Sequence, residues 1–282
     1  MSESDGSRAP ISPLSPPDHV SPAKRIAGFS GDPNFMASMA RGLAVINAFE
    51  DRKRHLTIAQ VSHRTEIPRA AVRRCLYTLM QLGYVTTDGR TYSLLPKVLT
   101  LGHAYLSSTP LAVSAQPYLD RLSEQLHEAC NLATLEGDNV LYIARSAIPQ
   151  RLISVDLSVG SRLPAYCTSM GRVLLAALDD QELTDYLANT ELQPRTRCTI
   201  ATADELWESL QQVRGQGWSL VDQELERGLR SIAVPVFDSA GHVLAAMNVS
   251  THAGRVALAD LERRVLPALL AASQQLSSQL CS

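Results

Sequence analysis

Three arginines in the segment Ile67 to Tyr84, IPRAAVRRCLYTLMQLGY, carry the clearest chemical signal in the chain. Arg69, Arg73 and Arg74, with Tyr77, fall outside an apolar series of three- and four-residue spacing that consists of Val72, Cys75, Leu76, Leu79 and Leu82. This spacing predicts a helix with one buried face and one cationic face. Pro68 suits its first turn and Gly83 its left-handed end. A cationic face suits a polyanion, but a merely solvated face has the same pattern, so the neighbouring segments must decide.

Cys167 is a second candidate for chemistry, because it directly precedes a predicted helix, where a thiolate would be stabilised. No histidine stands where a partner base is expected, since His242 adjoins a turn and His252 follows a strand. The seven histidines are dispersed, without the H-x-x-x-H or H-E-x-x-H spacing of metal ligands. We therefore predict no catalytic residues, no metal and no cofactor.

Length and composition limit the class of protein. A chain of 282 residues with 45% hydrophobic residues is long enough for two modest domains, each with its own core. No apolar run approaches the roughly 20 residues that cross a bilayer, and the N-terminal segment lacks the apolar region of a secretion signal. We expect a cytoplasmic protein with no membrane partner. Five scattered cysteines without a C-x-x-C pair are interpreted as reduced thiols.

The charges are distributed unevenly along the chain. Residues 1–98 contain 13 basic and 8 acidic residues, whereas residues 99–282 contain 13 basic and 20 acidic residues. A basic front half joined to an acidic back half indicates that only the front half meets a polyanion.

The front half reads as a tail followed by three short helices. Residues 1–33 are rich in Pro, Ser and Gly and are predicted to be a disordered tail. Within residues 35–50, Met39, Leu43, Ile46 and Phe49 or Glu50 form a helical stripe with Leu43 and Ile46 at its centre, which predicts the first helix. Thr57 can cap a second helix, IAQVSHRT. Only three or four residues connect it to the arginine helix, which indicates a helix-turn-helix.

A β-hairpin is predicted to follow the third helix. Two short β-rich runs flank Asp88-Gly89, which favours a two-residue turn because both residues accept positive φ. Three helices and a hairpin make a winged helix-turn-helix over residues 34–95. In that arrangement the third helix enters the major groove of DNA, and Arg90 lies at the tip of the wing.

Residues 96–115 predict a linker helix that is too short for a domain and too apolar to stay free, so we expect it to mediate self-association. Residues 116–282 then alternate helices with strands joined by hairpins. The strands are expected at 131–136, 140–144, 151–157, in GWSLVDQE, in SIAVPVFDS and in HVLAAMNVST. Helices are expected after Cys167, after Asp179 or Asp180, over 202–215 and from about Leu258. This pattern favours a mainly antiparallel α/β sheet.

These segments resemble the IclR family of bacterial transcriptional regulators across nearly all of residues 35–280. The matching motifs are MASMARGLAVINAF, IPRAAVRRCLYTLMQLGYV, LPAYCTSMGRVLLA and GWSLVDQELERGLRSIAVPVFDSAGHVLAAMNVS. The sequence looks most like the branch that controls catabolism of aromatic acids, the protocatechuate, 4-hydroxybenzoate and β-ketoadipate regulators. The resemblance implies an α+β fold class with an N-terminal winged helix-turn-helix, a linker helix and a C-terminal GAF-like effector domain.

The resemblance also implies a homodimer or dimer of dimers that responds to a small carboxylic acid. Many members have Gly at the position of Glu66 and Ser or Thr at Ala70 or Ala71, so here more of the phosphate contact is expected from arginines. We expect the DNA-binding residues to be Arg41, Thr57, Arg69, Ala70, Arg73, Arg74, Tyr77 and Arg90.

By position in the family motifs, the effector pocket is expected to use the loop before a helix and three strand segments. The amides at a helix start suit a carboxylate, and Arg230 or Arg162 is a candidate to pair with the acid. The expected pocket residues are Cys167, Thr168, Ser169, Met170, Gly171, Val221, Asp222, Glu224, Arg230, Ser231, Asn248 and Ser250.

We therefore predict a DNA-binding transcriptional regulator with a small organic acid effector and a palindromic or repeated operator in double-stranded DNA. RNA polymerase is an expected partner if the protein is an activator. One alternative is a DNA-binding dimer without a ligand, against which the polar loop CTSMG and the strand end Asn248-x-Ser250 argue. The other alternative is a cytosolic thiol hydrolase that uses Cys167.

Overall fold

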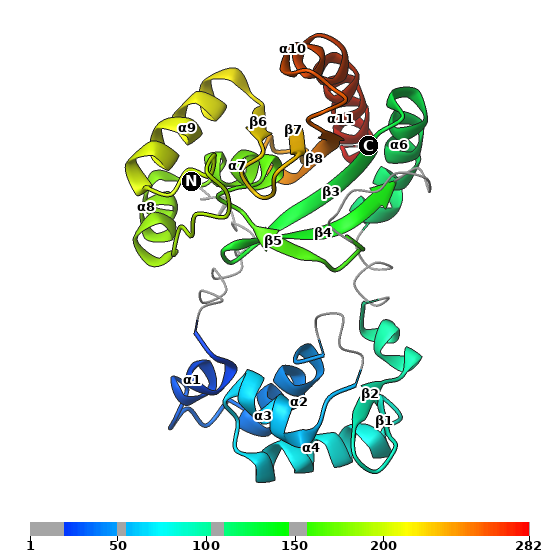
Figure 1. Cartoon of the computed structure of the whole chain (residues 1–282), viewed down its shortest axis with the longest axis vertical. Coiled ribbons are helices and arrows are strands. Elements are labelled where there is room, and N and C mark those ends of the chain that lie inside the picture. Colours follow the sequence, from blue (N-terminus) through cyan, green and yellow to red (C-terminus); the bar gives the residue numbers. More distant parts are fainter. Residues whose placement is uncertain (1–19, 50–54, 103–109, 147–156, 282) are drawn as a thin grey trace, which may run out of the picture. The chain divides into compact units, whose positions relative to one another are not determined.

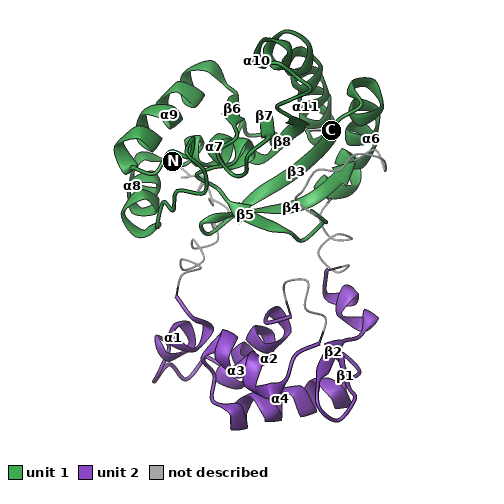
Figure 2. Cartoon of the chain, in the orientation of Figure 1, with its two compact units in different colours: residues 1–17, 110–282 green, residues 18–109 purple. Residues whose placement is uncertain are grey.

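The computed structural model describes residues 20–49, 55–102, 110–146 and 157–281. The chain divides into two compact units, residues 18–109 and residues 110–282 (Figure 2). Each unit has its own hydrophobic core. The predicted combination of an N-terminal helix-turn-helix and a C-terminal α/β domain is confirmed.

The N-terminal unit consists of short helices and a hairpin (Figure 1). Its elements are α1 (Pro22–Ala27), α2 (Ala37–Asn47), α3 (Ile58–Thr65), α4 (Arg69–Gln81), β1 (Val85–Thr87), β2 (Tyr92–Leu94) and the 3-10 turn η1 (Pro96–Val98). The core lies where α2, α3 and α4 meet, around Val45, Val61 and Leu76, each fully buried. The two strands pair in antiparallel fashion from Val85 with Leu94 to Thr87 with Tyr92.

The prediction of a disordered tail over residues 1–33 is wrong for its last part, and residues 1–19 lie outside the described residues. Helix α1 begins after Ser21, whose Oγ accepts a hydrogen bond from the Lys24 amide. Ile26 packs against the core of the unit, and the rings of Phe29 and Phe35 stack with centroids 4.4 Å apart. A six-residue helix has little stability alone, so α1 depends on these tertiary contacts.

The expected apolar stripe of the first helix faces the core only in part, because Phe49 is in the core and Ile46 packs against it, whereas Met39 and Leu43 do not. Met39 is 61% exposed and Leu43 is 48% exposed, while Val45 and Phe49 are buried. Leu82, predicted to be on the buried face of the arginine helix, is 53% exposed. These exposed side chains line a common groove between α2 and α4. Met39, Leu43 and Leu82 were therefore expected in the hydrophobic core but lie in an exposed groove.

The predicted linker helix is only partly described. Residues 99–102 are helical after η1, and residues 103–109 lie outside the described residues. The next helix, α6, runs from Pro110 to Leu126 with Pro117 inside it. The predicted domain boundary at residue 116 therefore falls within a continuous helix and is wrong. A proline is usually found in the first turn of a helix, whereas Pro117 lies inside α6.

The C-terminal unit is built on one antiparallel sheet. Within the described ranges six strands are ordered β5-β4-β3-β8-β7-β6. Their bounds are β3 (Ala129–Glu136), β4 (Asn139–Ser146), β5 (Arg162–Pro164), β6 (Ser219–Asp222), β7 (Leu229–Phe237) and β8 (Val243–His252). The predicted antiparallel arrangement is confirmed. The strand expected at 151–157 falls almost entirely outside the described residues.

Helices cover the sheet and complete the unit (Figure 1). α6 and α11 (Leu266–Leu280) contact one side of the sheet, and α7 (Ser169–Ala176) contacts β3, β7 and β8. α8 (Asp180–Asn189) begins at the predicted cap Asp179, and α9 (Ala203–Gln216) begins at Thr202. The C-terminal helix starts at Leu258 as predicted, with α10 (Leu258–Asp260) and a π-helical turn (Leu261–Val265) before α11.

A β-bulge in β4 changes which residues face α7. Leu132 of β3 pairs with Ala144, but the next residue, Ala133, pairs with Tyr142, so β4 carries one extra residue at Ile143. Alternate residues of a regular strand face opposite sides. The extra residue therefore lets Tyr142 and Arg145, three positions apart, face the same side of the sheet.

Candidate DNA interface and effector pocket

The exposed face of α4 carries the predicted DNA-contacting residues. Val72, Leu76 and Leu79 are buried and fix the helix on the core. Arg69, Ala70, Arg73, Arg74 and Tyr77 are all exposed on the opposite side. Pro68 precedes the helix instead of lying in its first turn. The structure thus presents three guanidinium groups on one solvated face.

The turn before α4 sets the direction of this face. Thr57 forms a capping box at the start of α3, in which its side chain and that of Gln60 bond the opposite backbone amides. Glu66 adopts a left-handed conformation with φ 56°, which favours Gly. Arg41 on α2 is half-buried beside Cys75. Thr57 and Arg41 are therefore less accessible than the α4 residues.

The wing turn differs from the predicted two-residue form. Four residues, 88–91, separate the paired strands, and of Asp88 and Gly89 only Gly89 has positive φ. The Asp88 carboxylate accepts hydrogen bonds from the amides of Arg90 and Thr91 at 2.8 and 2.6 Å, which lower its pKa to about 2, the Thr91 amide contributing most. This Asx-type turn competes with the tight hairpin turn. It leaves Arg90 exposed at the tip.

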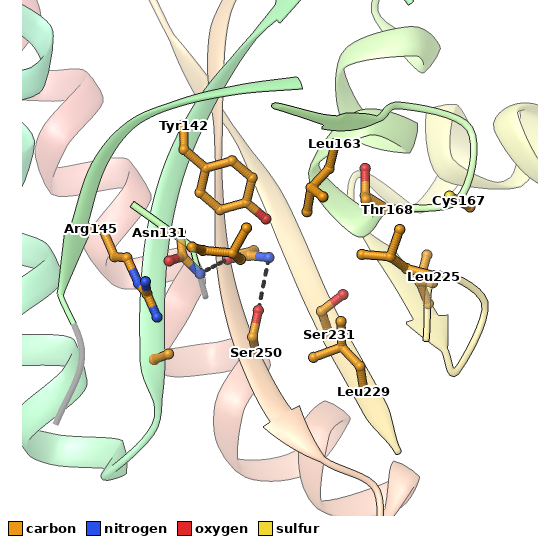
Figure 3. A pocket seen from close by; sticks show the side chains of 14 residues that line it. Asn131, Tyr142, Arg145, Leu163, Cys167, Thr168, Leu225, Leu229, Ser231 and Ser250 are labelled. Atoms are coloured by element: carbon orange, nitrogen blue, oxygen red, sulfur yellow. Dashed lines mark hydrogen bonds between the residues drawn. The ribbon is translucent and has the colours of Figure 1, made fainter. Parts of the chain in front are cut away.

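A pocket lies between the sheet and the start of α7 (Figure 3). Six of the predicted effector residues line it, namely Cys167, Thr168, Val221, Ser231, Asn248 and Ser250. Leucines 157, 163, 225 and 229 supply apolar wall. Figure 3 shows Asn131 and Arg145 on one side and Cys167 and Thr168 on the other. The pocket therefore has a polar floor and apolar walls, as small-ligand sites usually do.

Three predicted residues of the α7 segment support the pocket without lining it. Ser169 Oγ lies 3.5 Å from the Asn248 side-chain amide. Met170 is fully buried in the core. A Cβ on Gly171 would lie 2.1 Å from the Ala165 carbonyl oxygen, so this glycine lets the loop pack closely on the helix. These positions shape the site from behind.

The charged residues predicted for the pocket are held in ion pairs elsewhere. Arg230 Nε donates to Asp222 at 2.7 Å. Glu224 is buried and accepts from Arg172 at 2.6 Å. The second candidate cation, Arg162, pairs with Glu136 at the surface, also at 2.6 Å. None of these residues lines the pocket among the described residues, so neither candidate arginine faces it.

The cation that does line the pocket is Arg145, which the sequence reading missed. Its Nε is buried and has no hydrogen-bond partner in the described part of the chain. The bulge at Ile143 brings it to the same side as Tyr142, whose hydroxyl points into the pocket (Figure 3) and whose pKa is raised by burial. The other lining residues that were missed are Ala129, Asn131, Leu157, Leu163, Leu225 and Leu229. The strands β3 and β4 were predicted, but the predicted second strand ended at Ala144, one residue before Arg145, and nothing in the local pattern indicated the bulge.

Cys167 is not prepared for nucleophilic chemistry. Its side chain is buried, and burial raises the pKa of the thiol to about 11. At neutral pH the group is therefore a neutral thiol, which is a poor nucleophile. The described residues contain no group of three or more His, Cys, Asp or Glu that could hold a metal ion. None of the described helices is both long and apolar enough to cross a membrane.

Comparison with known families decides the class. Residues 38–89 match the IclR helix-turn-helix domain, and residues 103–278 match the bacterial transcriptional regulator IclR C-terminal domain. The chain belongs to the IclR family. It is a DNA-binding transcriptional regulator and not an enzyme, which removes the thiol hydrolase alternative.

Individual relatives agree with this assignment. The chain is 71% identical over 267 residues to the Pca regulon regulatory protein of Pseudomonas putida, covering 95% of this chain and 92% of that protein. Among solved structures, a transcriptional regulator from Rhodococcus is 43% identical with a TM-score of 0.77, covering 87% of this chain and 98% of that one. The inducer-binding domain of PobR from Acinetobacter, a double mutant in complex with 3-hydroxybenzoic acid, is 33% identical with a TM-score of 0.54, covering 58% and 95%.

Proposed function

We propose that this regulator controls genes for the breakdown of aromatic acids and that a small organic acid in the α7 pocket adjusts its action on DNA. The 71% identity to a Pca regulon regulatory protein over nearly the whole chain supports the choice of genes. A relative's inducer-binding domain in complex with 3-hydroxybenzoic acid supports an acid as the effector. The protein would act where the chromosome lies, in the cytoplasm.

The position of Arg145 in the pocket is the main support for the proposed effector site. It is the one charged residue among the described residues that line the pocket, and its Nε lacks a partner there. A buried Nε–H without an acceptor is unfavourable, whereas a guanidinium–carboxylate pair forms strong, charge-assisted hydrogen bonds. The four leucines around it would exclude water and contact an aromatic ring or a hydrocarbon chain. We assign Arg145 the role of binding the effector carboxylate.

Calorimetry with the full chain tests this site. Acids drawn from aromatic catabolism should bind saturably, and Arg145→Gln should weaken the binding of every acid by about 30-fold or more, because a buried charge pair is lost. Arg162→Gln is the matched control, since its ion pair is at the surface, and it should leave affinity unchanged. Binding by Arg145→Gln with the affinity of the unmodified protein would reject the site.

The exposed face of α4 would lie in the major groove of DNA, and Arg90 would contact the DNA backbone beside it. Arg69, Arg73 and Arg74 would supply the cations, and Ala70 and Tyr77 would contact base edges or sugars. A palindromic or repeated operator would be matched by two or more copies of the protein. If the protein activates transcription, RNA polymerase would be a further partner.

The groove between α2 and α4 is the surface we propose for pairing of two copies. Met39, Leu43 and Leu82 are exposed there, and Leu101 from the segment expected to self-associate lines the same groove. Contiguous exposed apolar side chains are typical of protein interfaces. Leu43→Glu should shift sedimentation toward the monomer and weaken operator binding, whereas an unchanged oligomer would place the interface elsewhere.

A further inference from the structure

A row of three polar side chains crosses the floor of the pocket. Arg145 on β4 lies opposite Asn131 on β3, and Asn131 lies opposite Asn248 on β8. Directly paired residues on neighbouring strands project from the same face of a sheet. Asn131 is 1% exposed and Asn248 is 3% exposed. Two buried asparagines thus stand beside the cation assigned to the effector carboxylate.

The two side-chain amides form a directional hydrogen-bond chain. Asn131 Nδ2 donates to Asn248 Oδ1 at 2.8 Å. Asn248 Nδ2 in turn donates to Ser250 Oγ at 3.3 Å and to Ser169 Oγ at 3.5 Å. The remaining atom, Asn131 Oδ1, is buried and has no hydrogen-bond partner in the described structure. Figure 3 shows the chain crossing the pocket floor between Arg145 and Ser250.

An unpaired amide oxygen at this depth needs a role. Buried polar groups in folded proteins are nearly always hydrogen-bonded, and exceptions gather at functional positions. Leucine has the same branching at Cγ as asparagine without its polar atoms, and would suit the surrounding apolar wall better. Asn131 Oδ1 is therefore positioned to accept a hydrogen bond from a polar group of a bound molecule.

The pair can offer either polarity. If both amides turn over together, the bond between them is kept, with Asn248 Nδ2 now donating to Asn131 Oδ1. Asn131 Nδ2 then faces the pocket, and Asn248 Oδ1 faces the hydroxyls of Ser250 and Ser169, which can donate as well as accept. A ligand hydroxyl meets an acceptor in one state, and a ligand oxo group meets a donor in the other.

We infer that the Asn131–Asn248 pair selects effectors that carry a hydroxyl or oxo group near the carboxylate held by Arg145. This inference rests on the proposed function of the pocket. An acid with only hydrocarbon at that place leaves an Asn131 amide atom unpaired in either orientation, which weakens its binding. Asn131 and Asn248 are thereby specificity-determining residues for the effector.

Matched acids test the inference by calorimetry on the full chain. One set is benzoate, 2-hydroxybenzoate and 3-hydroxybenzoate, whose hydroxyls lie close to the carboxylate. Because oxidative opening of an aromatic ring gives a straight-chain diacid, hexanedioate and 3-oxohexanedioate form the second set. Within at least one set, the substituted acid should bind on the order of 10- to 100-fold more tightly than its parent.

The Asn131→Leu variant should bring that ratio close to one, by weakening the substituted acid and leaving or improving the parent. Asn189→Leu on α8, an exposed asparagine away from the pocket, is the matched control and should keep the ratio. Far-UV circular dichroism and thermal unfolding check that the variants fold. Should Asn131→Leu fail to fold, the ratio in the unmodified protein still decides, because equal affinities for parent and substituted acids contradict the inference.

The outcomes separate the two proposals. If Arg145→Gln weakens all acids while Asn131→Leu keeps the full ratio, the carboxylate site stands and the asparagine role is overturned. If Arg145→Gln has no effect on acids that bind, the carboxylate site is overturned. Absence of saturable binding by every acid in both sets overturns both.

Discussion

The two units of this regulator place their cations in opposite ways. In the N-terminal unit, Arg69, Arg73 and Arg74 stand exposed on one helix, without an ion pair to any other described residue. In the C-terminal unit, Arg172 and Arg230 are buried in ion pairs, and Arg145 has a buried, unpartnered Nε in the pocket. The α4 arginines are thus available for a partner, whereas the ion pairs of Arg172 and Arg230 hold segments of the second unit together.

Under the proposed function, this contrast indicates how a ligand in the pocket would affect the packing of the C-terminal unit. The Arg172–Glu224 pair joins α7 to the segment after β6, and the neighbouring Leu225 lines the pocket. Glu224 also accepts from the Ile200 amide at 3.1 Å. A ligand that displaces Leu225 would therefore act on a network with several fixed partners. The exposed arginines of α4 have no comparable network.

Breaking the Arg172–Glu224 pair should give the largest effect. The side chains are only 4% and 8% exposed, so Glu224→Leu leaves an uncompensated buried guanidinium and should lower the free energy of unfolding by about 3–5 kcal/mol. Urea denaturation measures the loss. The double variant Arg172→Met/Glu224→Leu should recover much of it. Asp260→Asn, which removes an exposed pair with Arg263, should change stability by under about 1 kcal/mol.

The same contrast explains what the sequence could predict. The faces of α4 were predicted correctly as far as Leu79, because an exposed and a buried side produce a clear three- and four-residue period. The cap Thr57 and the cap at Asp179 or Asp180 were recognised for a similar reason, since capping depends on residues close in sequence. Local signals therefore gave most element positions and the antiparallel class of the sheet.

Errors arose where distant contacts decide. α1 is held by Glu66 and by the core of its unit, and neither is visible in the local sequence. Met39 and Leu43 have the spacing of a core face but lie in an exposed groove. Arg145 faces the pocket only because of the bulge at Ile143. A regular alternation would have put Arg145 and Tyr142 on opposite faces of the sheet.

Removing an exposed cation should affect DNA binding and leave the fold intact. Arg73→Ala should weaken operator binding by about 1–3 kcal/mol if the lost contact is to a guanine edge. If the contact is to a phosphate, the loss should be similar for all sequences, and the salt dependence should fall by about one unit of slope. Fluorescence anisotropy over a range of salt concentrations distinguishes these cases. Arg263→Ala, exposed on the other unit, is the control, and equal affinity of both variants would remove Arg73 from the interface.

Each unit also contains a left-handed residue that is not glycine, which allows a direct comparison. Glu66 has φ 56° and Gln223 has φ 60°, and replacing either with Gly relieves about 1 kcal/mol of backbone strain. Glu66 accepts an exposed bond from Ser21 Oγ at 2.6 Å, whereas Gln223 Oε1 accepts the partly buried Gly228 amide at 3.1 Å. Glu66→Gly should therefore stabilise the protein more than Gln223→Gly in thermal unfolding. The opposite order would mean that the α1 contact outweighs the strain.

The smallest effect concerns the wing, where an exposed carboxylate is tuned by backbone amides. Hydrogen bonds from Thr91 and Arg90 lower the pKa of Asp88 to about 2, below its value of about 3.9 in an unfolded chain. Because the folded-state pKa is depressed, the stabilisation of the turn is fully present above about pH 4 and is lost as the pH falls toward 2. Carbon-13 NMR of the Asp88 carboxyl group should show a midpoint near 2, and Thr91→Val should raise it by removing one donor. A midpoint near 4 in the unmodified protein would mean that these amides do not hold the carboxylate.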